Sequence, residues 1–302
     1  MQVVPKLARR MHTRSVNTEA TGGSADLAAL AADPSTPTPE LASALMRCAD
    51  PDCADPEALP VALELARHPD PEIRRAAAQV LPALGQLAAD DPNSRDAVVS
   101  SLIALTRDGD EDVRDWACFA LGTQLSDVDS PELRDALAER LDDEHDDTRC
   151  EATLGLARRS DPRTLPVLRL RLAAPNVYAL EIESAGALGD PSLHTLVRAH
   201  LAGWDDEVVP KVCAALRLTD PDGVGDDLLD GLADWYRAGS LPGAPPDGYW
   251  WGIAEGLLEL APRRAVEIAD AVRQRLARSG GGLDRLLSSP LADVARDHGW
   301  TG

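Results

Sequence analysis

The chain has 302 residues, of which 44% are hydrophobic but only 3% aromatic, and its formal net charge is −21. A surface this acidic repels nucleic-acid phosphates and anionic lipid, so we expect neither a nucleic acid nor a membrane as partner. The longest apolar runs are too short for a membrane span, and five scattered cysteines do not form the pattern of a disulfide framework, so we expect a cytoplasmic protein.

The first residues differ in charge from the rest of the chain. Residues 1–20 carry a formal charge of +3, because four basic residues face one acidic residue. They lack the apolar stretch of a secretory signal. We predict that residues 1–36 form a flexible basic leader that runs into the start of an N-terminal cap. Segments near 24–32 and 39–48 are the expected cap helices.

Three segments of the chain align without gaps, at residues 71–77, 111–117 and 146–152. In each, an arginine is followed three residues later by alanine and seven residues later by leucine; the arginines are Arg74, Arg114 and Arg149. Weaker copies follow at 177–189, with Glu181 at the arginine position, and at 207–218. Self-similarity at this period indicates a stack of helix pairs.

Asp-Pro dipeptides mark the starts of many of the predicted helices. Aspartate accepts hydrogen bonds from the free amides of a first helical turn, and proline fits the next position because it has no N–H to satisfy. The chain contains eight such pairs, including those at Asp70, Asp161 and Asp190. The predicted helix pairs are 57–68 with 72–88, 94–107 with 111–126, 131–142 with 147–159, 162–173 with 177–188, 191–203 with 206–218, 224–238 with 247–261, and 263–279 with 283–297.

These motifs resemble the HEAT-repeat family, particularly the short bacterial repeats named after phycobilisome lyases. The best copy is 110–122, which reads acidic-x-Val-Arg-x-x-Ala and then Ala-Leu-Gly, and the best junction is 187–191. The resemblance implies an all-α fold, a right-handed α-solenoid of about seven stacked antiparallel helix pairs. We predict HEAT-like repeats over 37–220 and divergent C-terminal repeats with an aromatic loop insertion over 221–302, continuous with the solenoid.

The resemblance also implies a structural role for the repeated arginines. In the family such residues form a ladder between repeats, and the ladder predicted here consists of Arg74, Asp112, Arg114, Asp147 and Arg149. The two aspartates match the family's acidic partner. Each partly exposed pair is expected to contribute about 1 kcal/mol or less.

No motif for catalysis, metal binding or cofactor binding stands out. The six histidines form no His-Glu dipeptide of the kind that binds iron in deoxyhypusine hydroxylase, a HEAT-like enzyme. Cys48 and Cys53 lack a second cysteine pair for zinc. The acidic run 142–147 lacks the glycine and closing glutamate of a calcium loop, and we interpret it as a solvated turn. We therefore predict no enzyme, no cofactor and no metal.

The aromatic residues gather in one region. Five of the ten lie at its rims, namely Trp235, Tyr236, Tyr249, Trp250 and Trp251, on either side of a glycine- and proline-rich loop. Aromatic side chains are favoured anchors at interfaces, yet they also fill a core where repeat geometry changes. Both interpretations stay open, and we name these residues as candidate interaction residues.

The preferred hypothesis is a non-catalytic protein-protein interaction scaffold or adaptor with an acidic solenoid surface. Its partner would be a protein or peptide with a basic surface. The alternative is a lyase-like enzyme or assembly factor that acts on a cofactor-bearing protein, since bilin lyases share the repeat type. The sequence makes no prediction of the oligomeric state.

Overall fold

A computed structural model describes residues 23–51, 54–88, 91–200, 208, 212–213, 216, 224–238 and 264–302. Every regular element in these residues is helical, and the prediction of an all-α solenoid is confirmed. In the described part, no helix is long and apolar enough to cross a membrane. The chain divides into two compact units, residues 1–167 and 168–302, which are described separately.

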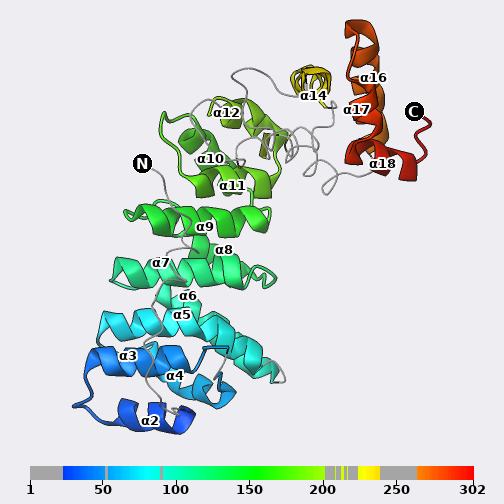
Figure 1. Cartoon of the computed structure of the whole chain (residues 1–302). Coiled ribbons are helices and arrows are strands. Elements are labelled where there is room, and N and C mark those ends of the chain that lie inside the picture. The colour runs from blue at the N-terminus through cyan, green and yellow to red at the C-terminus, as the bar shows by residue number, and fades with distance from the viewer. Residues whose placement is uncertain are drawn as a thin grey trace. The chain divides into compact units, whose positions relative to one another are not determined.

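The N-terminal unit is a stack of helix pairs (Figure 1). Its elements are α2 (Ser24–Ala32), α3 (Thr38–Arg47), the 3-10 turn η1 (Pro56–Ala58), α4 (Leu59–Leu65), α5 (Pro71–Leu87), α6 (Pro92–Leu105), α7 (Glu111–Phe119), the π-helical turn η2 (Ala120–Gln124), α8 (Pro131–Ala138) and α9 (Asp146–Arg158). The second helices α3, α5, α7 and α9 contact one another in series and form one layer. The first helices α4, α6 and α8 form the other.

The Asp-Pro signals act as predicted. Asp70 accepts the Glu72 N–H at 2.9 Å, and Pro71 is the first residue of α5. The same aspartate cap begins η1, α6 and, in the C-terminal unit, η3 (Pro191–Leu193). These caps fix the residue at which each helix begins. The apolar residues of each helix therefore face the core.

The core of the N-terminal unit lies between its two helix layers. On α5, Ile73, Ala77 and Leu81 are fully buried, and on α7 Val113 and Ala117 are too. Full burial of a large aliphatic side chain contributes roughly 1.5–3 kcal/mol. These side chains recur with the predicted helical period, so the apolar stripe accounts for the layering.

Glycine permits close packing between the second helices. A Cβ atom added to Gly155 on α9 would lie 2.7 Å from the Cα of Gly122 and 2.9 Å from Leu137 Cδ1. Gly122 belongs to η2, where the Leu125 N–H bonds the carbonyl of Ala120 at 2.9 Å. The two backbones therefore touch, and neither glycine has room for a side chain.

The C-terminal unit contains α11 (Ala179–Leu188), η3, α12 (His194–Arg198), α14 (Asp226–Ala238), α16 (Ala265–Ser279), α17 (Leu283–Leu287) and α18 (Pro290–Asp297); α10 (Thr164–Leu172) spans the division. Its described core joins α14 to α16, α17 and α18, with Leu232, Ile268 and Leu286 buried. Gly282 has a φ of +83° and leaves no space for a Cβ beside the backbone of Tyr236 and Arg237.

Most predicted helices match observed ones to within a few residues, but the predicted helix 283–297 is wrong. It is divided into α17 and α18, because Ser289 accepts the Ala292 N–H and Pro290 begins a new helix. The predicted helix 247–261 and most of 206–218 lie outside the described residues. The three domain boundaries drawn from the sequence stay predictions.

Candidate functional site

Arginines link successive turns of the N-terminal unit. Arg74 Nε and Nη2 each donate to Asp108 at 2.7 Å, across to the next repeat. Its Nη1 donates to the His68 carbonyl of its own turn at 2.8 Å. Two parallel N–H···O bonds fix both the distance and the orientation of the neighbouring repeat. Arg74 therefore connects two repeats and its own turn at once.

The next repeat copies this geometry. Arg114 Nε and Nη2 each donate to Asp143 at 2.9 Å, and Nη1 donates to the Asp108 carbonyl at 3.0 Å. Arg149 Nη1 donates to the Asp143 carbonyl at 2.6 Å, and its Nη2 pairs with Asp146 of its own turn. We use "inter-repeat ladder" for these contacts among Arg74, Asp108, Arg114, Asp143 and Arg149.

The acidic members of the ladder lie four residues before the predicted ones. Asp112 is 60% exposed and its carboxylate is 3.9 Å from Arg75 Nη1, while Asp147 is half-buried in the first turn of α9. Both are at helix N-termini, where the dipole favours an acid. Asp108 and Asp143 instead precede the helices. Their carboxylates accept the N–H groups of the residues two positions ahead, at 2.9 and 3.0 Å.

Histidine occupies the equivalent position at the start of the ladder. His68 lies six residues before Arg74, as Asp108 lies six before Arg114. Its Nδ1 accepts the Asp70 N–H at 3.1 Å, as the Asp108 carboxylate accepts the Asp110 N–H. The His68 imidazole thus closes this turn as the Asp108 carboxylate closes the next one. Unlike a carboxylate, it does not offer two oxygens to an arginine of a preceding repeat.

The ladder predicts an acid-dependent stability. Burial raises the pKa of Asp108 and of Asp143, but hydrogen bonds from Arg74, Arg114 and backbone amides lower each pKa overall. A lowered folded-state pKa gives stability that is present above the unfolded pKa of about 3.9 and is lost as pH falls through the folded value. We expect the free energy of unfolding to fall below about pH 4.

Denaturant titrations between pH 3 and pH 7 measure this dependence. In the double variant Asp108→Asn, Asp143→Asn we expect lower stability at pH 7 and a weaker further loss on acidification. The control is Asp96→Asn at an exposed site on α6, which should keep the parent slope. An unchanged acid slope in the double variant would show that the ladder carboxylates do not carry the effect.

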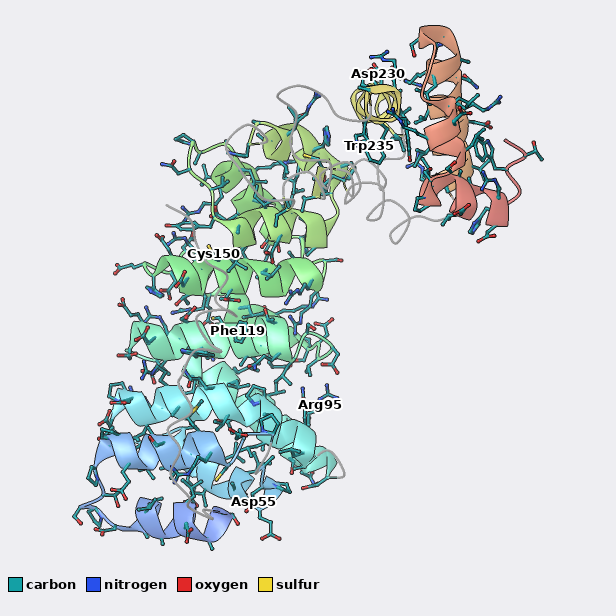
Figure 2. The ribbon with its side chains drawn as sticks, viewed as in Figure 1. Asp55, Arg95, Phe119, Cys150, Asp230 and Trp235 are labelled. Atoms are coloured by element: carbon teal, nitrogen blue, oxygen red, sulfur yellow. The ribbon has the colours of Figure 1, made fainter. Side chains whose placement is uncertain are left out.

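The second helices present a row of side chains on the side opposite the core. At 100° per residue, Asp115 and Phe119 on α7 point away from Ala117, and Cys150 and Leu154 on α9 point away from Ala152. We define the second-helix face by the outward residues of α5, α7 and α9, namely Arg75, Gln79, Asp115, Phe119, Cys150 and Leu154. Figure 2 labels Phe119 and Cys150 on their helices.

Burial on this face changes from one helix to the next. Arg75 and Gln79 on α5 are half-buried. On α7, Asp115 is 4% exposed and Phe119 8%, and on α9 both Cys150 and Leu154 are 3% exposed. The ring of Phe119 packs edge-to-face on Trp116 with centroids 5.8 Å apart. The outward positions of α7 and α9 are therefore as enclosed as a core.

Acidic turns flank this face. We define them as residues 107–115 and 140–151, which carry formal charges of −3 (two basic, five acidic) and −4 (two basic, six acidic). Asp108 and Asp143 each accept two hydrogen bonds from an arginine of the preceding repeat, and Asp112 lies 3.9 Å from Arg75 Nη1. Glu111, Asp112 and Glu144 are exposed. The predicted solvated turn 142–147 is part of this acidic edge.

Carboxylates also surround a buried thiol between α7 and α9. Cys118 is fully buried, and burial raises its pKa, with Asp115 and Glu151 raising it further. A thiol with a raised pKa is a poor nucleophile and a poor metal ligand. Among the described residues, no group of three or more His, Cys, Asp or Glu side chains is arranged to hold a metal ion. Cys53 lies outside the described residues.

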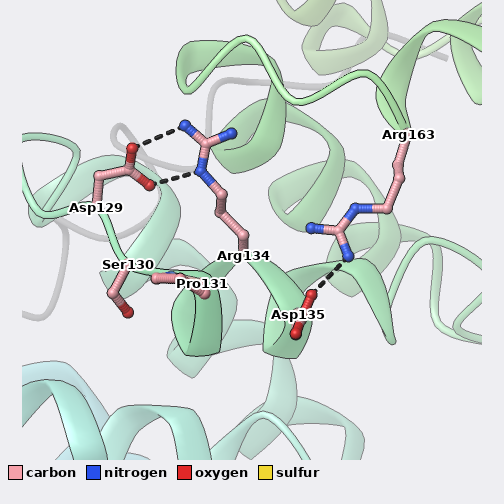
Figure 3. A pocket seen from close by; sticks show the side chains of 6 residues that line it. All are labelled: Asp129, Ser130, Pro131, Arg134, Asp135 and Arg163. Atoms are coloured by element: carbon pink, nitrogen blue, oxygen red, sulfur yellow. Dashed lines mark hydrogen bonds and ion pairs between the residues drawn. The ribbon is translucent and has the colours of Figure 1, made fainter.

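The first-helix side carries a hollow lined by Asp129, Ser130, Pro131, Arg134, Asp135 and Arg163 (Figure 3). Arg134 donates twice to Asp129 at 2.7 Å, and Arg163 Nη1 donates to Asp135 at 2.7 Å. Both guanidinium groups are matched by carboxylates. Their charges are therefore neutralised locally, and the hollow does not have the character of an anion site.

Of the candidate aromatic residues, two are described. Tyr236 is 3% exposed within the core of the C-terminal unit, and Trp235 is half-buried with its ring 4.7 Å from that of Tyr236. Tyr249, Trp250 and Trp251 lie outside the described residues. The structure thus gives Tyr236 a packing role, and an interaction site at this region stays a prediction.

Comparisons with known proteins match the repeats. Residues 58–88 match the family model for the HEAT repeat, and residues 98–189 match that for HEAT repeats. Both matches lie within the region in which the sequence resembles that family. Protein YibA of Escherichia coli strain K12 is 38% identical over 113 residues, which is 37% of this chain and 40% of that protein, and YibA of strain O157:H7 matches equally.

The chain therefore spans less than half the length of these curated relatives. An X-ray structure of Escherichia coli YibA superimposes with a TM-score of 0.42 at 25% identity, over 65% of this chain and 81% of that one. A crystal structure of an engineered protein gives a TM-score of 0.35 at 17% identity, over 91% of this chain and 98% of that one.

Proposed function

Since the chain is a HEAT-repeat protein, we propose that it is a non-catalytic scaffold whose second-helix face and acidic turns bind a basic polypeptide segment. HEAT-type solenoids offer an extended surface built from successive repeats, which suits an extended partner. The adaptor role, the acidic character of the binding surface and a cytoplasmic location all belong to this proposal.

The observation that carries the proposal is the alignment of the two acidic turns. The inter-repeat ladder holds Asp108 and Asp143 in equivalent places on successive repeats. The remaining carboxylates of the two turns therefore follow one edge of the second-helix layer rather than scattering over the surface. Such a field attracts cations and speeds the encounter with a basic partner.

Apolar side chains beside the acidic turns offer a partner hydrophobic contacts in addition to charge. Trp116 lies one residue past the acidic turn 107–115 and is half-buried, with its ring packed edge-to-face on that of Phe119. Aromatic and aliphatic anchors supply most of the affinity of protein interfaces, while charged rims give rate and orientation. We therefore expect the partner segment to alternate basic and apolar residues.

A fluorescein-labelled peptide of alternating arginine and leucine, measured by anisotropy with the full chain, tests the proposal. Neutralising four rim carboxylates (Glu111→Gln, Asp112→Asn, Glu144→Gln, Asp147→Asn) should weaken binding by about tenfold or more at low salt. The ladder residues are unchanged in this variant. The fold should therefore be preserved, which circular dichroism checks.

The matched control neutralises four exposed carboxylates on the first-helix side (Glu57→Gln, Glu64→Gln, Asp96→Asn, Glu132→Gln). It removes the same charge and should lose much less affinity. Equal losses in both variants would show only general attraction to an acidic protein and would contradict a defined site. If the purified chain instead carries a coloured or metal-containing group, the alternative of a lyase-like enzyme or assembly factor gains support.

A further inference from the structure

We infer that ionic strength controls the packing of the first-helix layer of the N-terminal unit, while the second-helix layer stays closed. Three ion pairs hold the first-helix layer together across repeats. We call them the first-helix ion pairs: Arg95–Asp127, Arg107–Glu139 and Arg163–Asp135. Their release lets α6 and α8 separate and bends the unit toward its second-helix face. This response requires no bound partner and is independent of the proposed function.

Two of these pairs tie α6 to α8 at both ends. Arg95 lies in the first turn of α6 and pairs with Asp127 in the turn before α8. Arg107 follows the last turn of α6, and its Nε and Nη2 donate to Glu139 at the end of α8, at 2.7 and 2.9 Å. Contacts at both ends fix the spacing of the two helices and, because one contact is bidentate, also their orientation.

The third pair joins α8 to the turn that follows α9. Arg163 Nη1 donates to Asp135 of α8 at 2.7 Å, while its Nε and Nη2 donate to Asp161 at 2.9 and 2.8 Å. The Asp161 side chain is buried, so it holds the guanidinium in place. Isolated surface ion pairs contribute little to stability, but bidentate pairs and networks contribute more. The first-helix ion pairs include both kinds.

These ion pairs are open to solvent, whereas the inter-repeat ladder is not. Their side chains are 42–69% exposed. In the ladder pairs Arg74–Asp108 and Arg114–Asp143 the side chains are 3–18% exposed. Dissolved salt screens exposed charges strongly and partly buried pairs much less. Salt therefore weakens the links of the first-helix layer more than those of the second-helix layer.

The packing of the two layers differs in the same direction. The backbones of Gly122 in η2 and Gly155 in α9 touch, and α7 packs on α9 more extensively than α6 packs on α8. Salt does not weaken such apolar and backbone contacts. The first-helix layer therefore depends more on its ion pairs. When they are screened, that side of the unit opens while the other side stays closed.

Hydrogen exchange of the full chain, followed by mass spectrometry, tests the inference. Raising NaCl from about 0.01 M to about 1 M shortens the Debye length from about 30 Å to about 3 Å. Salt also screens the repulsion within a chain of net charge −21, which slows exchange everywhere. The measured quantity is therefore the ratio of the exchange rates of α6 and α8 to those of α7 and α9. We expect this ratio to rise about threefold or more.

A triple variant removes the three cations while keeping hydrogen-bond donors (Arg95→Gln, Arg107→Gln, Arg163→Gln). It should show the raised ratio already at low salt and respond little to added salt. The control removes the same charge from the C-terminal unit (Arg237→Gln, Arg273→Gln, Arg296→Gln). Those side chains are 40–43% exposed and pair with an aspartate three residues earlier on the same helix. The control should keep the parent's salt response, and circular dichroism checks that both variants fold.

A charge exchange at one pair separates the ion pair from a general effect of charge. Glu139→Arg alone should raise the ratio at low salt, and adding Arg107→Glu should return it to the parent value. Either of two results overturns the inference: a ratio in the parent that salt leaves unchanged, or a triple variant with the parent's salt response. The proposed function is judged separately, by the selectivity of peptide binding, and survives either result.

Discussion

Replacing Arg159 with methionine is expected to lower the free energy of unfolding by about 3–5 kcal/mol. The Arg159 side chain is only 2% exposed. Nη1 donates to the Gly155 carbonyl at 2.7 Å, Nη2 to the carbonyls of Leu121 at 2.8 Å and Leu125 at 2.9 Å, and Nε to that of Val128 at 2.9 Å. Methionine would remove these donors from a buried site, and of the four carbonyls that of Leu125 would keep the Val128 N–H at 3.0 Å.

Equilibrium unfolding in urea, followed by circular dichroism, measures the loss. Lysine at this position should restore little of it, because one ammonium group cannot match the planar fork of the guanidinium. The control is Arg95→Met, where the side chain is 51% exposed and pairs with Asp127 at the surface; we expect a change within about 0.5 kcal/mol. Parent-like stability of Arg159→Met would show that water satisfies the carbonyls.

Gly155→Ala is expected to destabilise the chain by about 3 kcal/mol, although alanine is the better helix former. The added methyl group would lie 2.7 Å from the Cα of Gly122 and 2.9 Å from Leu137 Cδ1. Leu137 could adjust its rotamer, but a backbone Cα cannot withdraw without moving its helix. α9 and η2 would therefore have to move apart.

The matched control is Gly109→Ala in the turn before α7, where a Cβ would meet nothing within 4 Å. That change should be neutral or slightly stabilising, because alanine reduces the freedom of the unfolded chain. Thermal unfolding compares the two variants directly. If Gly155→Ala and the parent melt at the same temperature, the contact between Gly155 of α9 and Gly122 of η2 can widen without a loss of stability.

The repeat architecture could be predicted because its signals are local. An aspartate cap, a proline at the first helical position and an apolar period of 3.6 residues act within one or two turns, so the predicted bounds of α5 match the observed ones to one residue. The break between α17 and α18 had the same kind of signal in Ser289 and Pro290, but the continuing apolar pattern concealed it.

The partners of the repeated arginines were harder to predict. An acidic residue two positions before Arg114 or Arg149 is conspicuous in the sequence, whereas the carboxylate that pairs with the preceding arginine lies six positions before. Choosing between Asp108 and Asp112 requires knowledge of which side of the turn faces the neighbour. One sequence signal identifies the acidic partners of the arginines: an aspartate recurs six positions before both Arg114 and Arg149.

The π-helical turn and its arginine contacts have no simple sequence signal. Residues 120–124 continue a helical pattern, and the wider turn becomes evident only where Leu125 bonds the Ala120 carbonyl. Arg158 and Arg159 then donate to the carbonyls of Gly122 and Leu121. These bonds join residues more than 30 positions apart, so they depend on how the helices pack rather than on local propensity. The burial of the second-helix face is likewise a tertiary property.

The inter-repeat ladder gives the stack a direction. A repeat of this kind carries an arginine and, six residues earlier, an aspartate. The arginine donates to the next repeat and the aspartate accepts from the previous one, so identical repeats can stack head to tail. A single duplicated unit could therefore lengthen the array without any new contact having to evolve. The ladder stops inside the stack: His68 replaces the acceptor on the side of α3, which packs on α5, and Arg149 pairs with Asp146 of its own turn. Duplication within the stack, rather than addition at its ends, is therefore the change that this ladder accommodates.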